Sequence, residues 1–185
     1  MQPFPAPLAT DFEHVCLTSD EPEEVVPPMP RGATVAKLVQ GGGRIEHSFA
    51  IIERGYLGVR STSGSSGARE YWVNLAFLDP RPVRPAGSLL WSLAALLAFG
   101  RLVFCTRHGR VPVLELMRGE PDREQVKGFV AALEEAVHRA AAARPGSNGR
   151  LLRDEMKEHR RLLGAGVLQP HEFEAAKARI LRAHG

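Results

Sequence analysis

Two pairs of residues have types and a spacing that could support chemistry. Glu155 and His159 stand one turn apart on a predicted helix, where a carboxylate and an imidazole could share a metal ion. Two ligands do not make a site, and charge pairing across one helical turn explains them more simply, so we predict a solvated helix face. Cys105 and His108 could form an activated thiolate pair, but the strand-like residues around Cys105 favour a buried, small hydrophobic side chain.

The sequence carries none of the common catalytic motifs. It has no Gly-x-Ser-x-Gly elbow, no Walker-type phosphate loop and no His-Glu-x-x-His pair. Gly41–Gly43 could approach a phosphate, but Arg44 follows where a phosphate loop has lysine and a hydroxyl residue, so a hairpin turn is favoured. Cys16 and Cys105 have no paired spacing. We therefore predict that the protein is not an enzyme and has no catalytic residue, cofactor or metal.

Charge is distributed unevenly along the chain. The net charge is +3, yet residues 1–30 hold six acids and no lysine or arginine, which leaves +9 for the rest. An anion-binding patch would form if the arginines around the later strands share one face. These arginines are Arg81, Arg84, Arg101, Arg107, Arg110 and Arg118. Aromatic residues make up only 6% of the chain, which argues against a nucleic-acid partner that stacks bases.

The first segment, residues 1–31, has the composition of an extended acidic arm. Seven prolines remove backbone donors and favour extended backbone. Phe12, Val15 and Leu17 form a partly apolar stretch between acids, which makes them a candidate docking segment. No secretory signal is visible in the segment, and we expect a cytoplasmic protein.

Residues 32–143 predict a β-rich domain closed by a helix. The expected strands are Thr34–Val39, Ser48–Ser61, Tyr71–Leu78, Leu102–Thr106 and Val111–Met117. Turns rich in glycine join them, with Gly109 in the last one, and Pro112 marks an edge strand. A helix over 120–143, with Pro121 in its first turn, has its apolar stripe at Val126, Phe129, Val130, Leu133, Ala136 and Val137.

This order predicts an α+β fold, an antiparallel sheet or partly open barrel capped by the C-terminal helix of the domain. It resembles, in topology, the bacterial pleckstrin-homology-like domains over 32–143. The resemblance implies binding of lipids, peptides or proteins rather than catalysis.

An apolar segment, Leu89–Phe99, interrupts the strands. It is too short for a membrane crossing, which needs about 20 residues, so a core helix is our main interpretation. An interfacial segment or a membrane hairpin bounded by Arg84 and Arg101 remains an alternative. With the neighbouring arginines, the segment could make the protein a peripheral module for anionic lipid.

The last part, after a linker at 144–150, predicts a two-helix module over 151–183. Helices at 151–163 and 171–183 flank a break at Gly164–Gly166, and Pro170 starts the second helix. The module resembles the short C-terminal domain (SHOCT) family over Leu151–Leu181. The resemblance rests on Gly166-Val167-Leu168-Gln169, Glu172-Phe173, Lys177 and Ile180-Leu181. Gln169 departs from the usual capping Thr or Ser.

So small a module cannot bury enough apolar surface alone and must pack on something else. The resemblance implies an oligomerisation or interaction element, and we favour self-association over a mini-core closed between the two helices. The predicted apolar contacts are Leu152, Met156, Leu163, Val167, Leu168, Phe173, Ile180 and Leu181. The sequence thus predicts a scaffold that a protein partner or a second copy recruits; membrane binding is the alternative, and nucleic-acid binding is a weaker one.

Overall fold

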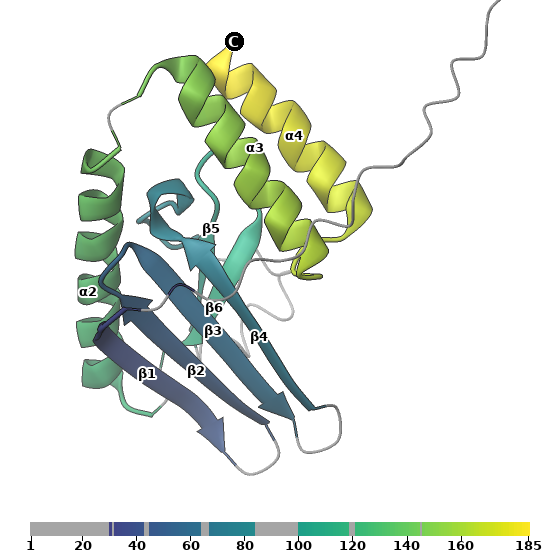
Figure 1. Cartoon of the computed structure of the whole chain (residues 1–185). Coiled ribbons are helices and arrows are strands. Elements are labelled where there is room, and N and C mark those ends of the chain that lie inside the picture. Colours follow the sequence, from purple (N-terminus) through teal and green to yellow (C-terminus); the bar gives the residue numbers. More distant parts are fainter. Residues whose placement is uncertain are drawn as a thin grey trace, which may run out of the picture.

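The computed structural model describes residues 30, 32–42, 45–63, 67–83, 100–118, 121–144 and 146–185. Within them, the chain forms a four-stranded antiparallel sheet, a two-stranded sheet and three α-helices (Figure 1). The predicted α+β class with an open antiparallel sheet is confirmed. The arm with Phe12, Val15 and Leu17, together with Arg84 and Leu89–Phe99, lies outside the described residues.

The larger sheet is a meander in which each strand pairs with the next. Its strands are β1 (Thr34–Gly42), β2 (Ile45–Ile52), β3 (Tyr56–Ser63) and β4 (Gly67–Asn74), in the order β1-β2-β3-β4. The single strand predicted over Ser48–Ser61 is wrong, because Gly55 adopts φ 80° and its N–H donates to the Ile52 carbonyl at 3.0 Å. That tight turn separates β2 from β3. Gly41, which pairs with Glu46 near the end of β1, has the positive φ (85°) expected of the glycines between β1 and β2.

The strand predicted over Tyr71–Leu78 ends early, at Asn74. The Asn74 side chain accepts a hydrogen bond from the Ala76 N–H at 3.0 Å and so starts a short 3-10 helix, η1 (Leu75–Phe77). All three residues of η1 are buried.

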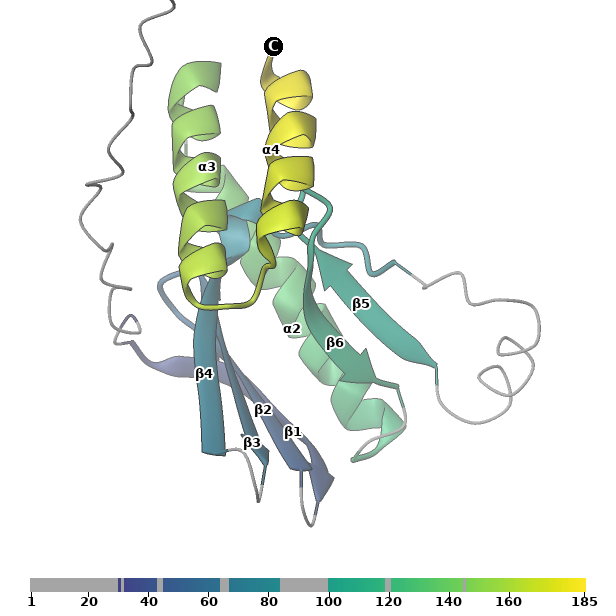
Figure 2. The ribbon, with the colours of Figure 1, turned by 90° about the vertical axis from the view of Figure 1, so that its right-hand side faces the viewer.

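The smaller sheet pairs β5 (Arg101–Cys105) with β6 (Pro112–Met117), facing the larger sheet (Figure 2). The Gln40 side-chain amide joins the two sheets, since it donates to the Met117 carbonyl at 2.6 Å and accepts from the Met117 N–H at 2.9 Å. In the β5–β6 turn, Arg110 rather than Gly109 has the positive φ, 54°.

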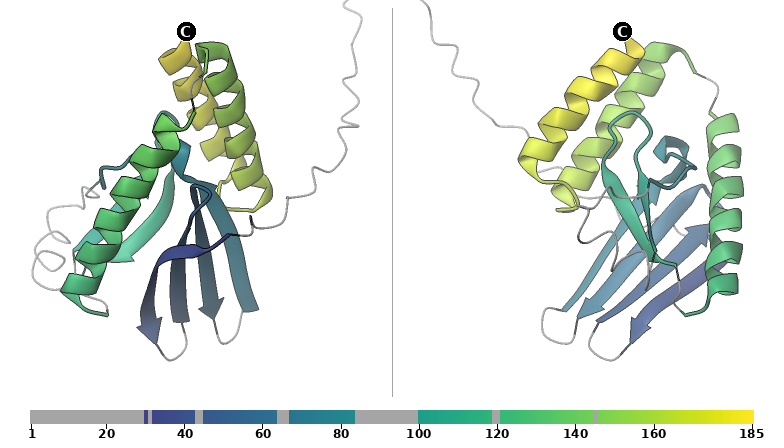
Figure 3. Two further views of the ribbon diagram at one scale, coloured as in Figure 1. Left: turned by 60° about the vertical axis from the view of Figure 1, so that its left-hand side comes forward. Right: turned by 180° about the vertical axis from the view of Figure 1, so that it is seen from behind.

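Helix α2 (Arg123–Ala142) covers one open side of the sheets (Figure 3). It begins later than predicted: Asp122 is the N-cap and accepts from the N–H groups of Glu124 and Gln125, so Pro121 precedes the cap. Five of the six predicted stripe residues are buried, and Val130 is half-buried against the core. We call β1–β6, η1 and α2 the β body.

Helices α3 (Asn148–Gly164) and α4 (Pro170–His184) form the C-terminal hairpin (Figure 1). Helix α3 starts three residues before the predicted position, which shortens the predicted 144–150 linker. Glu172 accepts from the Gln169 N–H at 2.8 Å, so α4 is capped without a Thr or Ser. Leu162, Leu168 and Ala176 of the hairpin belong to the same hydrophobic core as the sheets and α2. No helix in these described ranges is long and apolar enough to span a membrane.

Candidate functional site

The face of α3 that meets the β body is charged and polar. Four of its residues, Glu155, Glu158, His159 and Arg161, are 1%, 6%, 0% and 8% exposed, and the neighbouring Leu162 is 0% exposed. The prediction that Glu155 and His159 lie on a solvated helix face is therefore wrong. Buried polar groups of this kind require partners, and the structure supplies them from the β body.

Glu158 and Arg161 cover the free edge of the larger sheet. Glu158 accepts from the Asn74 N–H at 2.9 Å, and Arg161 donates to the Trp72 carbonyl. The two side chains also pair with each other at 2.7 Å, and the Arg161 guanidinium lies 3.4 Å from the centre of the Trp72 ring. Because β4 is the last strand of its sheet, these contacts satisfy backbone groups that would otherwise be open to another strand.

His159 holds the β5–β6 turn against α3. Its Nδ1 donates to the Glu155 backbone carbonyl at 2.9 Å, since a carbonyl can only accept, and its Nε2 lies 3.1 Å from Thr106 Oγ1. A Cβ on Gly109 would overlap His159 Nε2, so glycine is required for this close approach. From α4, Arg179 donates to the Gly109 carbonyl at 2.5 Å, so both helices hold the turn.

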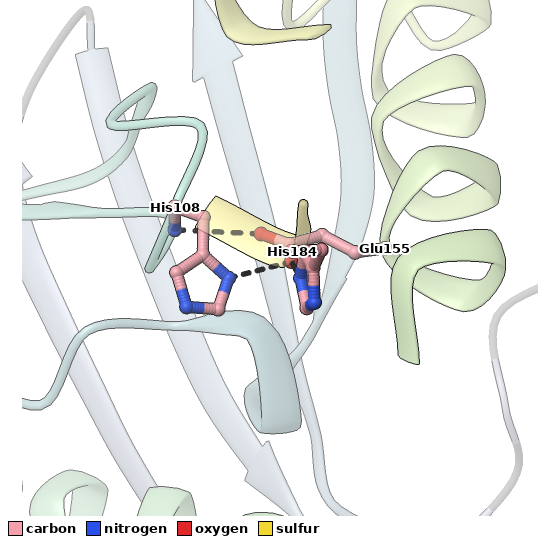
Figure 4. Close-up of side chains that lie close together, drawn as sticks. All are labelled: His108, Glu155 and His184. Atoms are coloured by element: carbon pink, nitrogen blue, oxygen red, sulfur yellow. Dashed lines mark hydrogen bonds and ion pairs between the residues drawn. The ribbon is translucent and has the colours of Figure 1, made fainter. Parts of the chain in front are cut away.

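A carboxylate and two imidazoles meet beside this turn (Figure 4). Glu155 Oε2 lies 2.7 Å from His108 Nδ1 and 3.1 Å from His184 Nε2, and Glu155 Oε1 accepts from the His108 backbone N–H at 3.4 Å. The two imidazole rings lie edge to face, with their centres 4.8 Å apart. The Glu155 side chain is 1% exposed, that of His184 9% and that of His108 33%. These three side chains come from the β5–β6 turn, α3 and α4, and together they can hold a cation between these elements.

Sequence reasoning missed this cluster because it considered Glu155 only with its neighbour one turn away. His108 and His184 lie 47 and 29 residues from Glu155 in the chain. No local spacing signals contacts at such separations. His108 was considered with Cys105, but its ring contacts Glu155 instead.

Cys105 itself is buried, as predicted. Burial raises the pKa of its thiol, an effect that Arg110 opposes and Asp79 reinforces. A thiol of this kind is a weak nucleophile.

The predicted apolar contacts of the C-terminal hairpin divide into three groups. Leu168, Phe173 and Ile180 are buried within the chain, so they do not form an open surface for a partner. Leu152, Met156, Leu163 and Val167 are half-buried. Leu181 is 49% exposed. Leu168, with Leu163 and Val167 packed beside it, joins the core of the sheets and α2, so the β body supplies part of the support that the short helices need.

The predicted arginines do not gather on one patch in the described part of the chain. Arg101 and Arg118 lie at the open end of the β5–β6 pair, whereas Arg107 and Arg110 lie in the turn at its opposite end. Arg101 pairs with Glu115, and Arg110 pairs with Asp79 at 2.7 Å. Arg81 lies with Arg110 around a cavity of about 610 Å³.

A separate groove of about 480 Å³ lies between the larger sheet and β6. Its lining includes His47, Phe49 and Tyr71 from the sheet and Arg101, Glu115 and Met117 from the β5–β6 pair. The Tyr71 hydroxyl donates to the Val113 carbonyl at 3.0 Å, which fixes its ring beside the groove. Burial raises the pKa of this phenol, and the nearby Arg69 opposes the rise.

Comparison of the chain with protein-family models, with curated proteins and with solved structures gave no match.

Proposed function

We propose that the protein is a cytoplasmic, non-enzymatic interaction protein. In this proposal the β body binds a partner, and the C-terminal hairpin recruits or multimerises the chain. The resemblance of 32–143 to pleckstrin-homology-like domains and of Leu151–Leu181 to the SHOCT family supports the two roles.

The groove between the larger sheet and β6 carries the binding role. Its volume is within the range of ligand sites, and it combines apolar and aromatic side chains with a few charged groups that can orient a ligand. Ile45, 52% exposed, adds an apolar side chain at its border. Aromatic and apolar contacts beside the Arg101–Glu115 pair suit a peptide segment of a partner protein.

The outer surface of the C-terminal hairpin carries the recruiting role. Leu181 is an exposed large apolar residue on α4, and Leu152 and Met156 of α3 are only half-buried. A second copy of the chain can cover such side chains without opening the buried contacts to the β body.

Substitution in the groove tests the binding role. Ile45→Glu places a charge at the groove, and Val35→Glu is its matched control, because Val35 is 48% exposed on the same sheet and does not line the groove. We expect partners captured from a cell extract by the wild type and by Val35→Glu to be lost from Ile45→Glu, as quantified by mass spectrometry. Identical recoveries from the two variants would contradict the groove as the binding site.

Light scattering after size exclusion tests the recruiting role. We expect the wild type to show a multiple of 20.2 kDa, and Leu181→Glu to show the monomer mass. Ala178→Glu is the control, since it adds the same charge at an exposed position of α4 without removing a large apolar side chain. A wild-type mass of 20.2 kDa at every concentration would remove self-association from the proposal.

A further inference from the structure

We propose that His108, Glu155 and His184 form a binding site for a divalent transition-metal ion of the zinc class. The site lies outside the groove and the outer surface of the C-terminal hairpin, so it stands or falls independently of the proposed function.

The donor set is the first argument. Two imidazole nitrogens and one carboxylate oxygen form a three-ligand set that zinc accepts, with water in a fourth position. Imidazole favours zinc, copper, nickel and iron over magnesium and calcium, which prefer oxygen ligands. The site should therefore discriminate between these two groups of cations.

The geometry is the second argument. The three ligand atoms all lie within 4.8 Å of one another, and two of the separations are 2.7 and 3.1 Å. In a tetrahedral site with metal–ligand bonds of about 2.0–2.1 Å, ligand atoms are separated by about 3.3 Å. Glu155 Oε2 therefore has to move about 0.6 Å away from His108 Nδ1 and about 0.2 Å away from His184 Nε2. The two nitrogens, which lie within 4.8 Å of each other, have to approach, and rotation of the partly exposed His108 ring can supply that movement.

Burial is the third argument. The Glu155 carboxylate is 1% exposed, and a buried carboxylate requires compensating positive charge. A metal ion supplies that charge without requiring the imidazoles to be protonated. His108, 33% exposed, provides the side by which an ion and its water ligand enter.

The surroundings of the ligands are already ordered. The His108 N–H donates to Glu155 Oε1, His159 binds the Glu155 backbone carbonyl, and Arg179 holds the Gly109 carbonyl beside His108. Such outer contacts orient metal ligands. The ligands come from the β5–β6 turn, α3 and α4, so a bound ion would tie the C-terminal hairpin to the β body.

Metal titration of the untagged full chain tests the proposal. After chelator treatment and dialysis, Co²⁺ should bind at one equivalent and give the visible absorption of a tetrahedral site, and Zn²⁺ should displace it. Zn²⁺ should also raise the melting temperature, because an ion that binds only the folded state stabilises it. Mg²⁺ at the same concentration should neither displace Co²⁺ nor raise the melting temperature.

Two variants make the test specific. His184→Gln removes a ligand from the last turn of α4, and His171→Gln removes an exposed histidine from the first turn of the same helix. We expect His184→Gln to weaken Zn²⁺ binding at least about tenfold and to abolish the Co²⁺ band, and His171→Gln to leave both unchanged. Binding of equal strength in both variants, or no binding by the folded wild type, would overturn the proposal and leave the three side chains as a hydrogen-bonded group without a metal role.

Discussion

Replacement of Glu158 by glutamine tests how α3 is held on the edge of the larger sheet. In Glu158→Gln, the side-chain carbonyl can still accept from the Asn74 N–H, which lies 2.9 Å from the present carboxylate. What is lost is the negative charge 2.7 Å from the Arg161 guanidinium. Arg161 then becomes a buried cation without a counter-charge, because its side chain is only 8% exposed.

The expected cost follows from this burial. Removal of one partner from a buried ion pair typically costs about 3–5 kcal/mol, because the remaining charge is desolvated without compensation. The Trp72 ring, 3.4 Å from the guanidinium carbon, remains as a cation–π partner in the variant. We therefore expect the lower end, about 3 kcal/mol, or a fall of about 6–12 °C in melting temperature.

Urea denaturation followed by far-ultraviolet circular dichroism measures this loss. The matched control is Glu174→Gln, because Glu174 pairs with Lys177 at the same i,i+3 spacing on α4 with both side chains exposed. It should lose less than about 1 kcal/mol. Adding Arg161→Met to Glu158→Gln should recover part of the stability, since the unpaired charge is removed. Equal losses in Glu158→Gln and Glu174→Gln, or strictly additive losses in the double variant, would refute the reasoning.

Three further predictions concern the turn, the shared core and the groove. Gly109→Ala should cost about 1–3 kcal/mol of stability, because the added Cβ overlaps His159. The control Gly128→Ala places its Cβ in open space on α2 and should stabilise the protein by about 0.5–1 kcal/mol. Urea denaturation that ranks the two variants in the opposite order would contradict the close packing of Gly109 against His159. Leu168→Ala should cost about 2–5 kcal/mol of stability, whereas Leu181→Ala, at an exposed position, should cost less than about 0.5 kcal/mol. Similar urea midpoints for the two variants would exclude a core shared by the C-terminal hairpin and the β body. Burial raises the pKa of the Tyr71 phenol above 10.0, so the folded state holds this proton more tightly than the unfolded state does. The contribution of the neutral phenol to stability is therefore complete below about pH 10 and is lost as the pH rises further. Tyr71→Phe should therefore show a weaker fall in stability above about pH 10, and identical pH profiles would contradict a buried phenol.

The turns and the apolar stripe of α2 could be predicted because they depend on local chemistry. Gly41 adopts a positive φ near the end of β1, and the stripe from Val126 to Val137 follows the helical period. The division between β2 and β3 was missed because apolar residues continue on both sides of Gly55, and a single glycine within a strand-like run also fits a bulge.

The sequence by itself determined the α+β class with an open antiparallel sheet, the long helix after the strands and the terminal helical pair, because each depends on side-chain periodicity and turn residues close together in the chain. Only the tertiary structure decided that Glu155, Glu158, His159 and Arg161 are buried. Hydrophobic periodicity assigns charged residues to solvent, and it cannot register partners such as Asn74, Thr106, His108 and His184, which reach them from distant elements. Burial of a charge depends on those partners, and the fold alone brings them together.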